Sequence, residues 1–496
     1  MNKSIKEISG QLVMGIDLGS SSCKAVLIDQ ACHIHAQAEY AYPTSTPRAG
    51  WAEQNPRDWI KAVHQVSRQI IALFPAARSE VRAIGLTSAA HIGVLLDERF
   101  NILRPAILWN DQRSSLQAEQ LNDQHGQLIL RQTCQAASSS WTLSHLAWVK
   151  EHEPDIWSKV KLILPSKDYL AWYLAGTTHT DPATAVSLQL FDVSSQTWSN
   201  QLCGLLQLTP INLPTVKPAN QIIGSLSDSA AQAMGLPNGI PIVNGTLDSA
   251  TELYAGRCTQ PGQAMIRLAT AGGLQVVVDK AVPHTQRITY PHLVSPYWYV
   301  QAGTNTCAAA VQWGLERFCP NLSHQQAQEL AQEVQPGSDG LLFHPYLAGE
   351  RSPYWNPKLR ASLTGLSMAH TAGHIYRALL EGTAMSISDA MRALKDLPIC
   401  DEPIRLTGGG TRNRLWVEIL ASVLDRSLQI TANANSTIGA SYLALQALCG
   451  SSWLITENRQ APQSLVIHPK KNWVEQYQAH FQRYLDQAAY NVRTQS

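Results

Sequence analysis

An acid followed by a run of small hydroxyl residues stands near the start of the chain, in Asp17-Leu18-Gly19-Ser20-Ser21-Ser22-Cys23-Lys24. Tight glycine and serine turns bind phosphate because their small side chains let backbone N–H groups approach the oxygens. Asp17 lies in an apolar run, where an acid is costly unless it is paired or lies near a metal ion. The pattern predicts a phosphate loop in which Asp17 reaches Mg²⁺ directly or through water. The alternative is a plain hairpin turn whose aspartate bonds the loop.

Two further turns of small residues occur later in the chain. Leu268-Ala269-Thr270-Ala271-Gly272 lies about halfway along, and Leu406-Thr407-Gly408-Gly409-Gly410-Thr411-Arg412-Asn413 lies between a predicted strand and a predicted helix. Three glycines at such a junction let a flat ligand lie against the backbone, although a flexible loop has the same composition. The chain has no P-loop motif, protein-kinase motif set or dinucleotide-binding G-x-G-x-x-G after a strand.

Strand and helix patterns alternate along the whole chain and must position these loops. The apolar runs 12–19 and 24–29 flank the first turn and predict a hairpin. Residues 82–88 and 91–97 predict a second strand pair, and residues 161–166 predict a short strand before a helix over 167–176.

The first turn has an approximate repeat in the second half of the chain. Met14 to Asp29 and Met265 to Asp279 both consist of an apolar strand, a small-residue turn and a second apolar strand ending in aspartate. Two such copies indicate a duplicated domain, unless two generic hairpins resemble each other by chance. We predict an N-terminal domain over 11–256, a C-terminal domain over 262–450 and a helical tail over 451–496.

Composition is typical of a globular protein. The chain has 496 residues, of which 45% are hydrophobic and 15% charged, with a formal net charge of +1. This length favours two large domains. The basic residues form no stripe that would bind nucleic acid, and no apolar run is long enough to span a membrane. Nine scattered cysteines and a start without an apolar signal sequence predict a reduced, cytoplasmic protein.

The three loops, in this order and spacing, resemble those of the FGGY carbohydrate kinases, a branch of the actin, Hsp70 and hexokinase-like ATPase superfamily. The similarity extends from about Val13 to Leu448 and is closest to the xylulokinases. Further matching strings are Gly50-Trp51-Ala52-Glu53-Gln54, Arg104-Pro105-Ala106-Ile107-Leu108-Trp109-Asn110-Asp111, His152-Glu153-Pro154, Lys167-Asp168-Tyr169-Leu170 and Pro345-Tyr346-Leu347-Ala348-Gly349-Glu350-Arg351-Ser352-Pro353.

The resemblance implies an α/β fold of two ribonuclease-H-like, actin-like ATPase domains. Each would have a mixed sheet flanked by helices, with an interdomain cleft. Sugar would bind mainly to the N-terminal domain and ATP mainly to the C-terminal domain. The implied reaction is ATP-dependent phosphorylation of a small keto-sugar, above all xylulose to xylulose 5-phosphate, with Mg²⁺. The family also implies a homodimer as one possible assembly, although no self-complementary patch can be identified in the sequence.

Two acids match the catalytic residues of the family. Asp248, in Asn244-Gly245-Thr246-Leu247-Asp248-Ser249-Ala250, matches the general base, and Asp17 matches the acid near the metal and phosphates. A sugar kinase needs a group that accepts the hydroxyl proton. Without the resemblance, an aspartate after a strand is more often a helix N-cap.

The resemblance also assigns the ligand-binding residues. The sugar site would comprise the base Asp248 and five further residues: Ala90, His91, Trp109, Asn110 and Asp111. The nucleotide site would comprise ten residues: Ser20, Ser21, Lys24, Thr270, Gly272, Ala308, Gln312, Gly409, Gly410 and Asn413. Without the family, Trp109 would more often belong to the core and His91 would more often be structural.

Several positions depart from the family pattern. The usual Gln-Met-His-Gly appears as Ala89-Ala90-His91-Ile92, the second phosphate loop lacks a hydroxyl and a glycine, and a signature lysine appears as His145. Leu247 and Ser249 flank the base where the family usually has Gly and Asn. These changes leave open a kinase for ribulose, L-xylulose, gluconate or glycerol, and a sugar or nucleotide sensor with impaired catalysis.

Overall fold

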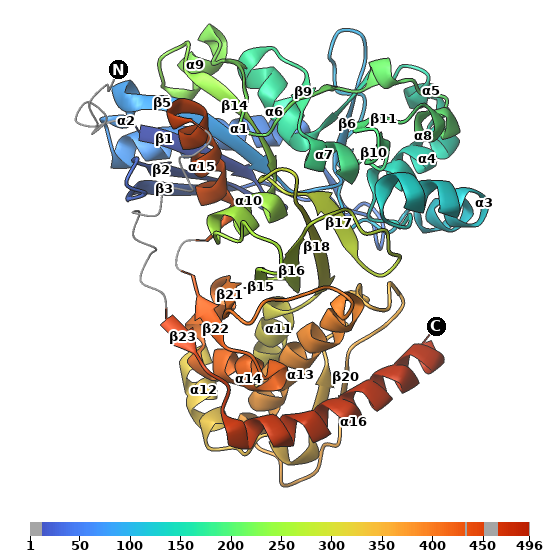
Figure 1. Ribbon diagram of the computed structural model, residues 1–496, viewed down its shortest axis with the longest axis vertical. Coiled ribbons are helices and arrows are strands. Elements are labelled where there is room, and N and C mark those ends of the chain that lie inside the picture. The colour runs from blue at the N-terminus through green and yellow to red at the C-terminus, as the bar shows by residue number, and fades with distance from the viewer. Residues whose placement is uncertain (1–11, 432–433, 451–464, 496) are drawn as a thin grey trace. The chain divides into compact units, whose positions relative to one another are not determined.

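The computed structural model describes residues 12–431, 434–450 and 465–495, which form two compact units (Figure 1). The first unit contains the described parts of Met1–Arg257, Tyr290–Ser295 and Ala434–Gln460. The second contains Cys258–Thr289, Pro296–Asn433 and Ala461–Ser496, again in their described parts. In these residues no helix is long and apolar enough to cross a membrane.

A six-stranded mixed sheet lies at the centre of the first unit, in the order β13-β14-β5-β1-β2-β3. The strands are β1 (Leu12–Leu18), β2 (Ser22–Ile28), β3 (Ile34–Ala41), β5 (Val81–Ser88), β13 (Ile222–Ser225) and β14 (Pro241–Leu247). β5 runs parallel to both β1 and β14, whereas β2 pairs with β1 and β3 in antiparallel register. The predicted hairpin over 12–19 and 24–29 is therefore confirmed.

Helices cover both faces of this sheet, and alternate residues of β1 pack on opposite sides. Met14 and Ile16 belong to the core that includes Trp59 of α1 (Pro56–Leu73), whereas Val13 packs in the core that contains residues of α10 (Asp248–Ala255) and α15 (Ser436–Cys449). Every residue of β1 is buried, as expected for a strand covered on both faces.

The helix α15 packs in the first unit although its sequence lies near the C-terminus. A Cβ atom on Gly15 would lie 2.1 Å from the carbonyl oxygen of Thr437, and one on Gly85 would lie 2.0 Å from that of Ala440. The two glycines thus allow α15 to lie directly against β1 and β5. The sequence-based boundary at 450 had assigned this helix to the C-terminal domain, and the contacts divide the chain differently.

The predicted pairing of 82–88 with 91–97 is wrong. β5 belongs to the central sheet, whereas β6 (Gly93–Leu96) pairs with β8 (Leu162–Pro165) in a separate two-stranded sheet. β8 precedes α6 (Ser166–Ala175), as predicted. Further elements of the first unit are β4 (Glu53–Gln54), α2 (Ala77–Glu80), β7 (Ala106–Ile107), α3 (Ser115–Thr133), α4 (Thr142–His152), α5 (Pro154–Trp157), β9 (His179–Thr180), α7 (Pro182–Ser187), β10 (Phe191–Asp192), β11 (Thr197–Trp198), α8 (Asn200–Leu205), β12 (Thr215–Val216) and α9 (Asp228–Met234).

The second unit repeats the strand arrangement of the first. Its sheet has the order β17-β18-β16-β15-β21-β22-β23. The strands are β15 (Ala264–Leu268), β16 (Gly272–Val278), β17 (Ile288–Pro291), β18 (Trp298–Thr304), β21 (Ile404–Thr407), β22 (Leu428–Ile430) and β23 (Leu465–Ile467). β15 pairs antiparallel with β16 and parallel with β21, as β1 does with β2 and β5. Both predicted copies of the hairpin are confirmed.

Helices of the second unit pack against this sheet and against one another. They are α11 (Ala308–Phe318), α12 (His324–Gln332), α13 (Ala372–Met391), α14 (Arg414–Leu424) and α16 (Lys471–Gln495), beside a small sheet of β19 (Leu342–His344) and β20 (Ser362–Thr364). Tyr477 and Tyr484 of α16 are buried in the core of this unit, and β23 pairs with β22. The described part of the predicted tail is therefore a strand and a helix of the second unit.

Candidate active site

Three parallel strands of the first unit end side by side, and candidate site residues follow each end. Leu18 of β1 and Leu247 of β14 are both in register with Ser88 of β5. Gly19 follows the first strand, Ala89 the second and Asp248 the third. In α/β sheets ligands bind outside the carboxyl ends of parallel strands, so this edge is where chemistry is expected.

The predicted first phosphate loop is a tight turn whose backbone carbonyls accept hydrogen bonds from side chains elsewhere in the first unit. The N–H of Gly19 donates to the carbonyl of Ser22 at 3.0 Å, which closes the turn between β1 and β2. The hydroxyl of Tyr42 donates to the carbonyl of Gly19, and the amide of Gln54 donates to the carbonyl of Ser20 at 2.7 Å. With the carbonyls occupied in this way, the loop keeps one shape.

Trp109 and Ser20, predicted for the sugar and the phosphates respectively, are in direct contact. The indole N–H of Trp109 donates to the hydroxyl of Ser20 at 2.8 Å. Ser21 is exposed, and Lys24, the cross-strand partner of Asp17, forms a 3.8 Å ion pair with Glu39. The structure thus brings Trp109 to the first loop, while Lys24 has an acidic neighbour on β3.

Asp17 is only 6% exposed, and its carboxylate has a partner that sequence analysis missed. The hydroxyl of Ser436, the first residue of α15, donates to Oδ2 of Asp17 at 2.6 Å. A hard carboxylate oxygen beside a loop of serines is a donor set that suits Mg²⁺. No sequence signal could have paired residues so far apart in the chain.

Asp248 is the first residue of α10 and is half-buried. Its Oδ1 accepts the backbone N–H of Ser249 at 2.7 Å. The N-cap of the helix is Leu247, which has no side chain able to cap, so Asp248 is not the N-cap. A carboxylate oxygen can accept a proton, so the side chain of Asp248 has the chemistry that a general base needs.

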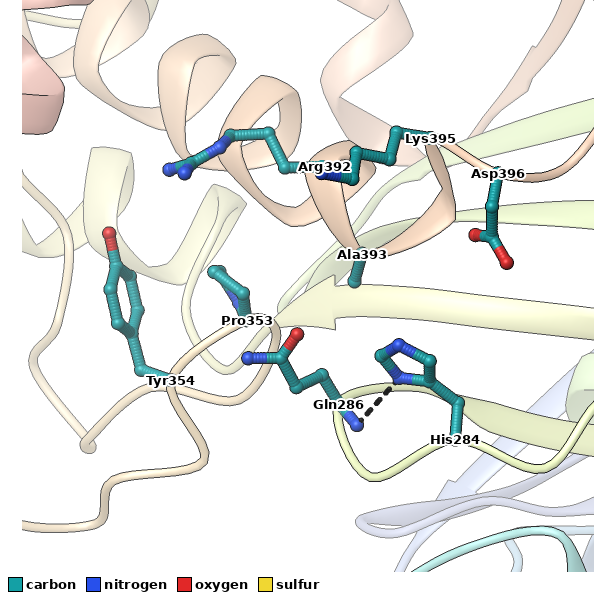
Figure 2. Close-up of a pocket in the computed structure, with 8 residues that line it drawn as sticks. All are labelled: His284, Gln286, Pro353, Tyr354, Arg392, Ala393, Lys395 and Asp396. Carbon is teal, nitrogen blue, oxygen red and sulfur yellow. Dashed lines mark hydrogen bonds between the residues drawn. The ribbon is translucent and has the colours of Figure 1, made fainter.

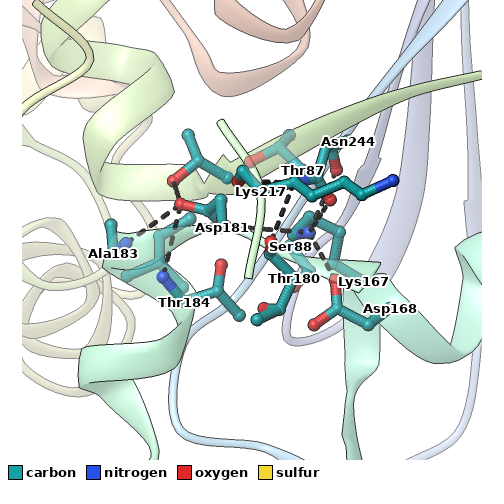
Figure 3. A network of polar contacts seen from close by, with 12 residues as sticks. Thr87, Ser88, Lys167, Asp168, Thr180, Asp181, Ala183, Thr184, Lys217 and Asn244 are labelled. Atoms are coloured by element: carbon teal, nitrogen blue, oxygen red, sulfur yellow. Dashed lines mark hydrogen bonds and ion pairs between the residues drawn. The ribbon is translucent and has the colours of Figure 1, made fainter. Parts of the chain in front are cut away.

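A buried polar network holds β14, the strand that ends directly before Asp248 (Figure 3). The ammonium of Lys167 contacts Asp168 and donates to the carbonyl of Asn244 at 3.0 Å. The hydroxyl of Thr246 donates to Oδ2 of Asp181 at 2.6 Å. Burial raises the pKa of Asp168 to about 6. The network thus holds β14 at Asn244 and Thr246, four and two residues before the candidate base Asp248.

Gly245 allows the same strand to approach β5 closely. Its φ is +73°, and a Cβ atom there would lie 1.7 Å from the carbonyl oxygen of Leu86. Only glycine fits such a position without displacing the strand. The signature Asn244-Gly245 is thus explained by packing behind the site.

His91 has a positive φ of 63° and both of its ring nitrogens are engaged. Its Nδ1 lies 3.0 Å from the carbonyl oxygen of Ser187, which can only accept, so Nδ1 donates. Nε2 then accepts from the hydroxyl of Tyr290 at 3.0 Å. The ring of Trp141 meets that of His91 edge-on at 3.9 Å between centroids, and Ala90 beside it is half-buried. Sequence analysis had not singled out Tyr290 or Trp141.

Asp111 is fully buried and its carboxylate already has four donors. Arg113 donates to it through its backbone N–H at 2.8 Å, Nε at 2.9 Å and Nη2 at 2.7 Å, and the N–H of Ala52 donates at 2.6 Å. Asp111 therefore positions Arg113 and the 50–52 segment, and direct contact with sugar stays a prediction. Its neighbour Asn110 is exposed.

His145 is the residue that the resemblance matches to a signature lysine of the family. Burial lowers the pKa of His145 to about 4, and its Nε2 lies 2.7 Å from the carbonyl oxygen of Ser139. The imidazole is thus neutral at physiological pH, and the positive charge of the family lysine is not replaced.

The second predicted phosphate loop, in the second unit, is held by the start of α11. The N–H of Cys307 donates to the carbonyl of Thr270, and that of Ala308 to the carbonyl of Ala269, both at 2.8 Å. A Cβ atom on Gly272 would lie 2.8 Å from that of Cys307, so glycine is needed for this approach. Thr270, Gly272 and Ala308 therefore meet in one place.

Two more predicted nucleotide residues, Asn413 and Gln312, are linked by a hydrogen-bond chain. Asn413 caps α14 and donates through Nδ2 to the hydroxyl of Tyr376 at 3.2 Å. Tyr376 contacts Nδ1 of His324 at 2.9 Å, and Nε2 of His324 contacts Oε1 of Gln312 at 2.6 Å. Because an amide oxygen only accepts, His324 donates from Nε2 and accepts from Tyr376. Tyr376 and His324 were not predicted.

The three-glycine turn lies beside the second loop. Gly408 has φ +100°, and a Cβ atom there would lie 2.3 Å from the carbonyl oxygen of Leu268, the last residue of β15. A Cβ atom on Gly410 would lie 2.7 Å from the ring of Trp416, whereas Gly409 has open space around it. Gly409 therefore presents bare backbone, as a nucleoside platform would require.

A cavity of about 380 Å³ in the second unit is lined by none of the predicted residues (Figure 2). Its lining residues are His284, Gln286, Pro353, Tyr354, Arg392, Ala393, Lys395 and Asp396. Arg392 pairs with Asp389 at 2.9 Å, and Asp396 pairs with the buried Arg287. None of the ten predicted nucleotide residues lines this cavity.

Comparison with known proteins decides the family. A model of the FGGY family of carbohydrate kinases, N-terminal domain, matches residues 12–254, and one of the C-terminal domain matches residues 275–448. The chain belongs to the FGGY family of carbohydrate kinases. It is therefore a phosphotransferase of a family whose kinases use ATP as substrate.

Individual FGGY relatives differ in their named substrates. The chain is 28% identical over 479 residues to a xylulose kinase of Bacillus subtilis (strain 168), covering 95% of each chain. It is 29% identical over 453 residues to a gluconokinase of the same strain, covering 88% of this chain and 87% of that one. The crystal structure of a xyloylose kinase from Brucella ovis has a TM-score of 0.87 and 29% identity, and covers 96% of this chain and 98% of that one. The predicted two-domain, actin-like ATPase fold is confirmed.

Proposed function

We propose that this FGGY kinase transfers the γ-phosphoryl group of ATP to a hydroxyl of a small keto-sugar, with xylulose giving xylulose 5-phosphate. The observation that carries the proposal is the row of strand ends that places Asp248 and the first phosphate loop on either side of Ala89 to His91. The Bacillus subtilis xylulose kinase, similar over nearly the whole chain, supports the choice of sugar.

In the proposed reaction Asp248 accepts the proton of the attacking hydroxyl. The sugar oxygen bonds to the γ-phosphorus, the bond from that phosphorus to the bridging oxygen breaks, and ADP leaves with that electron pair. Trp109 and His91 would form an aromatic wall for the sugar, and Asn110 a polar contact. The loops of Ser20 to Ser21 and Thr270 to Gly272 would present N–H groups to the phosphates.

Asp17 would hold Mg²⁺, directly or through water, and its carboxylate suits this hard cation. When bound, the ion neutralises phosphate charge. Ser436 orients the Asp17 carboxylate by its 2.6 Å hydrogen bond.

The test of the base is Asp248→Asn, which keeps the shape of the side chain but not its proton affinity. Turnover should fall roughly 10²–10⁴-fold, the usual contribution of a general base, with little change in sugar affinity. Asp228→Asn is the matched control, because Asp228 is also the first residue of a helix in the same unit but is exposed. Near-normal turnover of Asp248→Asn in a coupled ADP assay would end the assignment.

Gluconate is the second candidate substrate. The gluconokinase of Bacillus subtilis is as similar to this chain as the xylulose kinases are, and Ala89-Ala90 replaces the Gln-Met of xylulokinases. Losing an amide removes hydrogen bonds toward a sugar hydroxyl, which relaxes discrimination at that carbon. We expect D-xylulose to be phosphorylated without being strongly preferred over ribulose, L-xylulose, gluconate and glycerol.

The measurement is kcat/KM across that panel. A preference for D-xylulose above about a hundredfold, roughly 2.7 kcal/mol, would mean that the two alanines have not relaxed the site. ADP release with none of the sugars would favour the sensor instead, although both Asp17 and Asp248 are retained. A cytoplasmic location and a homodimer stay expectations, which fractionation and light scattering would test.

A further inference from the structure

Glu350 is a buried acid of the second unit that the proposed reaction does not use. It is 3% exposed, and four donors surround its carboxylate. Oε1 accepts the backbone N–H of Asn305 at 3.0 Å and of Arg351 at 2.7 Å. Oε2 accepts the hydroxyls of Thr304 at 2.6 Å and Ser386 at 3.3 Å. Such an arrangement holds a carboxylate, and everything that donates to it, in one place.

Two of these donors begin the turn that leads into α11. Thr304 ends β18, and Asn305 to Cys307 connect it to Ala308, the first residue of the helix. Two further contacts tie this turn to the segment before Glu350. The amide of Asn305 donates to the carbonyl of Ala348 at 3.1 Å, and the hydroxyl of Thr306 donates to the carbonyl of Pro345. The turn is thus fastened along one side to the 345–350 segment.

The other side of the same turn holds the second phosphate loop. The N–H groups of Cys307 and Ala308 donate to the carbonyls of Thr270 and Ala269, as described above, and the N–H of Ala309 donates to Thr270 at 3.3 Å. The hairpin pairing of Leu268 with Gly272 and a 3.3 Å bond from Ala269 to Ala271 close the loop at its base. The three hydrogen bonds from the 307–309 backbone hold the carbonyls of Ala269 and Thr270, so the turn helps to set the shape of the loop.

We propose that Glu350 is a positioning residue for the nucleotide. It holds the 304–308 turn, and the turn holds Ala269 to Gly272 in the shape that presents N–H groups to phosphate. The inference rests on the proposed nucleotide role of that loop. This role explains the glutamate of the Gly349-Glu350-Arg351-Ser352-Pro353 string by its contacts with the 304–308 turn.

The test is calorimetric titration of the full chain with ADP and Mg²⁺, which needs no sugar and no turnover. Glu350→Ala should weaken ADP binding about tenfold or more, since a displaced binding group can cost up to about a hundredfold. Glu350→Gln should stay within about threefold, because its amide oxygen still accepts from Asn305 and Arg351. Thr304→Val, which removes one donor with little change of shape, should fall between the two.

The matched control is Asp389→Asn. Asp389 is another buried acid of the second unit, but it pairs with Tyr354 at 2.6 Å and with Arg392 at 2.9 Å, and does not contact the turn. The substitution Asp389→Asn should lower the melting temperature of the protein without weakening ADP binding. The melting temperature of every variant is measured alongside. If Glu350→Ala does not fold, the ADP affinity of Thr304→Val is compared with that of Glu350→Gln instead.

Two results would overturn the proposal and differ in what they reject. If the unmodified protein binds ADP but Glu350→Ala and Thr304→Val bind it equally well, or Asp389→Asn weakens binding as much as they do, Glu350 has no positioning role. If the unmodified protein does not bind ADP, the nucleotide role of the loop fails, and the role of Glu350 fails with it.

Discussion

The hydroxyl of Ser436 donates a 2.6 Å hydrogen bond to Oδ2 of Asp17, joining residues that are 419 positions apart in the chain. Both side chains are buried. Ser436 begins α15, which lies against β1 at Gly15 and against β5 at Gly85. A helix from near the C-terminus therefore orients the acid that we propose for the metal.

Replacing Ser436 by alanine should weaken the metal site without destroying it. The change removes one hydrogen bond to a charged group, worth about 1.5–3 kcal/mol, so we expect about tenfold lower turnover and a higher Mg²⁺ requirement. Asp17→Ala should nearly abolish activity. Ser441→Ala is the control, because Ser441 lies on the same helix but donates to Thr437 at 2.9 Å. An unchanged Mg²⁺ dependence in Ser436→Ala would contradict this role.

The buried network behind Asp248 should be required for turnover. Thr246→Val removes the hydroxyl that donates to Asp181 at 2.6 Å, and the loss of a bond to a buried charge costs about 1.5–3 kcal/mol. We expect turnover about tenfold lower, with the KM for ATP unchanged. Thr184→Val is the control, because its hydroxyl has no partner among the described residues. Equal turnover in the two variants would separate the network from catalysis.

Lys167 should be essential to the stability of the same network. Lys167 pairs with Asp168 and, at 3.7 Å, with Asp181. Lys167→Met leaves both acids buried without their cation, a change that typically costs about 3–5 kcal/mol. We expect a markedly lower melting temperature. A variant as stable as the unmodified protein would mean that the two acids are neutral or find other partners.

Tyr290 should influence the choice of sugar through His91. Tyr290→Phe removes the hydroxyl that donates to Nε2 of His91 at 3.0 Å. In that variant Nε2 can accept a hydrogen bond from a sugar hydroxyl instead. We expect the ranking of kcat/KM across the sugar panel to change, by about three- to tenfold for at least one sugar, a range set by one hydrogen bond. Tyr254→Phe, a buried tyrosine of the same unit that bonds Gln446, is the control. An unchanged ranking would remove Tyr290 from the specificity determinants.

Glu350 should make stability depend on pH. Burial raises the pKa of Glu350 from 4.5 to about 7, so the folded state favours the protonated form. The stabilisation relative to a fixed neutral residue is full below about pH 4.5 and is lost as pH rises through about 7. Arg351 is the charged neighbour, and Tyr346, Tyr484 and Cys307 stay neutral over this range, since burial raises the pKa of each.

Melting temperatures from pH 4.5 to 8 test this directly. Relative to Glu350→Gln, the unmodified protein should lose stability as pH rises, by an amount on the order of 3 kcal/mol at most. Two melting curves that shift in parallel with pH would show that Glu350 does not titrate in this window.

Local patterns predicted much of the architecture. The two hairpins, the strand before α6 and the glycine turn before α14 follow from apolar runs and turn residues, which act between neighbours in sequence. The pairing of 82–88 with 91–97 was wrong because β6 finds β8 as its partner, and strand pairing over long separations leaves no local signal. The place of α15 was likewise hidden, although Gly15 and Gly85 are the residues that admit it.

By itself, the sequence determined the family, the two-fold repeat and the candidate residues Asp17, Asp248, Trp109 and Thr270, because these depend on residue types in recognisable strings. Only the tertiary structure decided which groups meet: Ser436 with Asp17, Tyr290 with His91, Trp109 with Ser20 and Glu350 with the turn before α11. It also showed that the Asp111 carboxylate already accepts hydrogen bonds from Arg113 and Ala52. These contacts arise from strand register and helix packing, which bring together side chains that the chain itself separates by up to hundreds of residues.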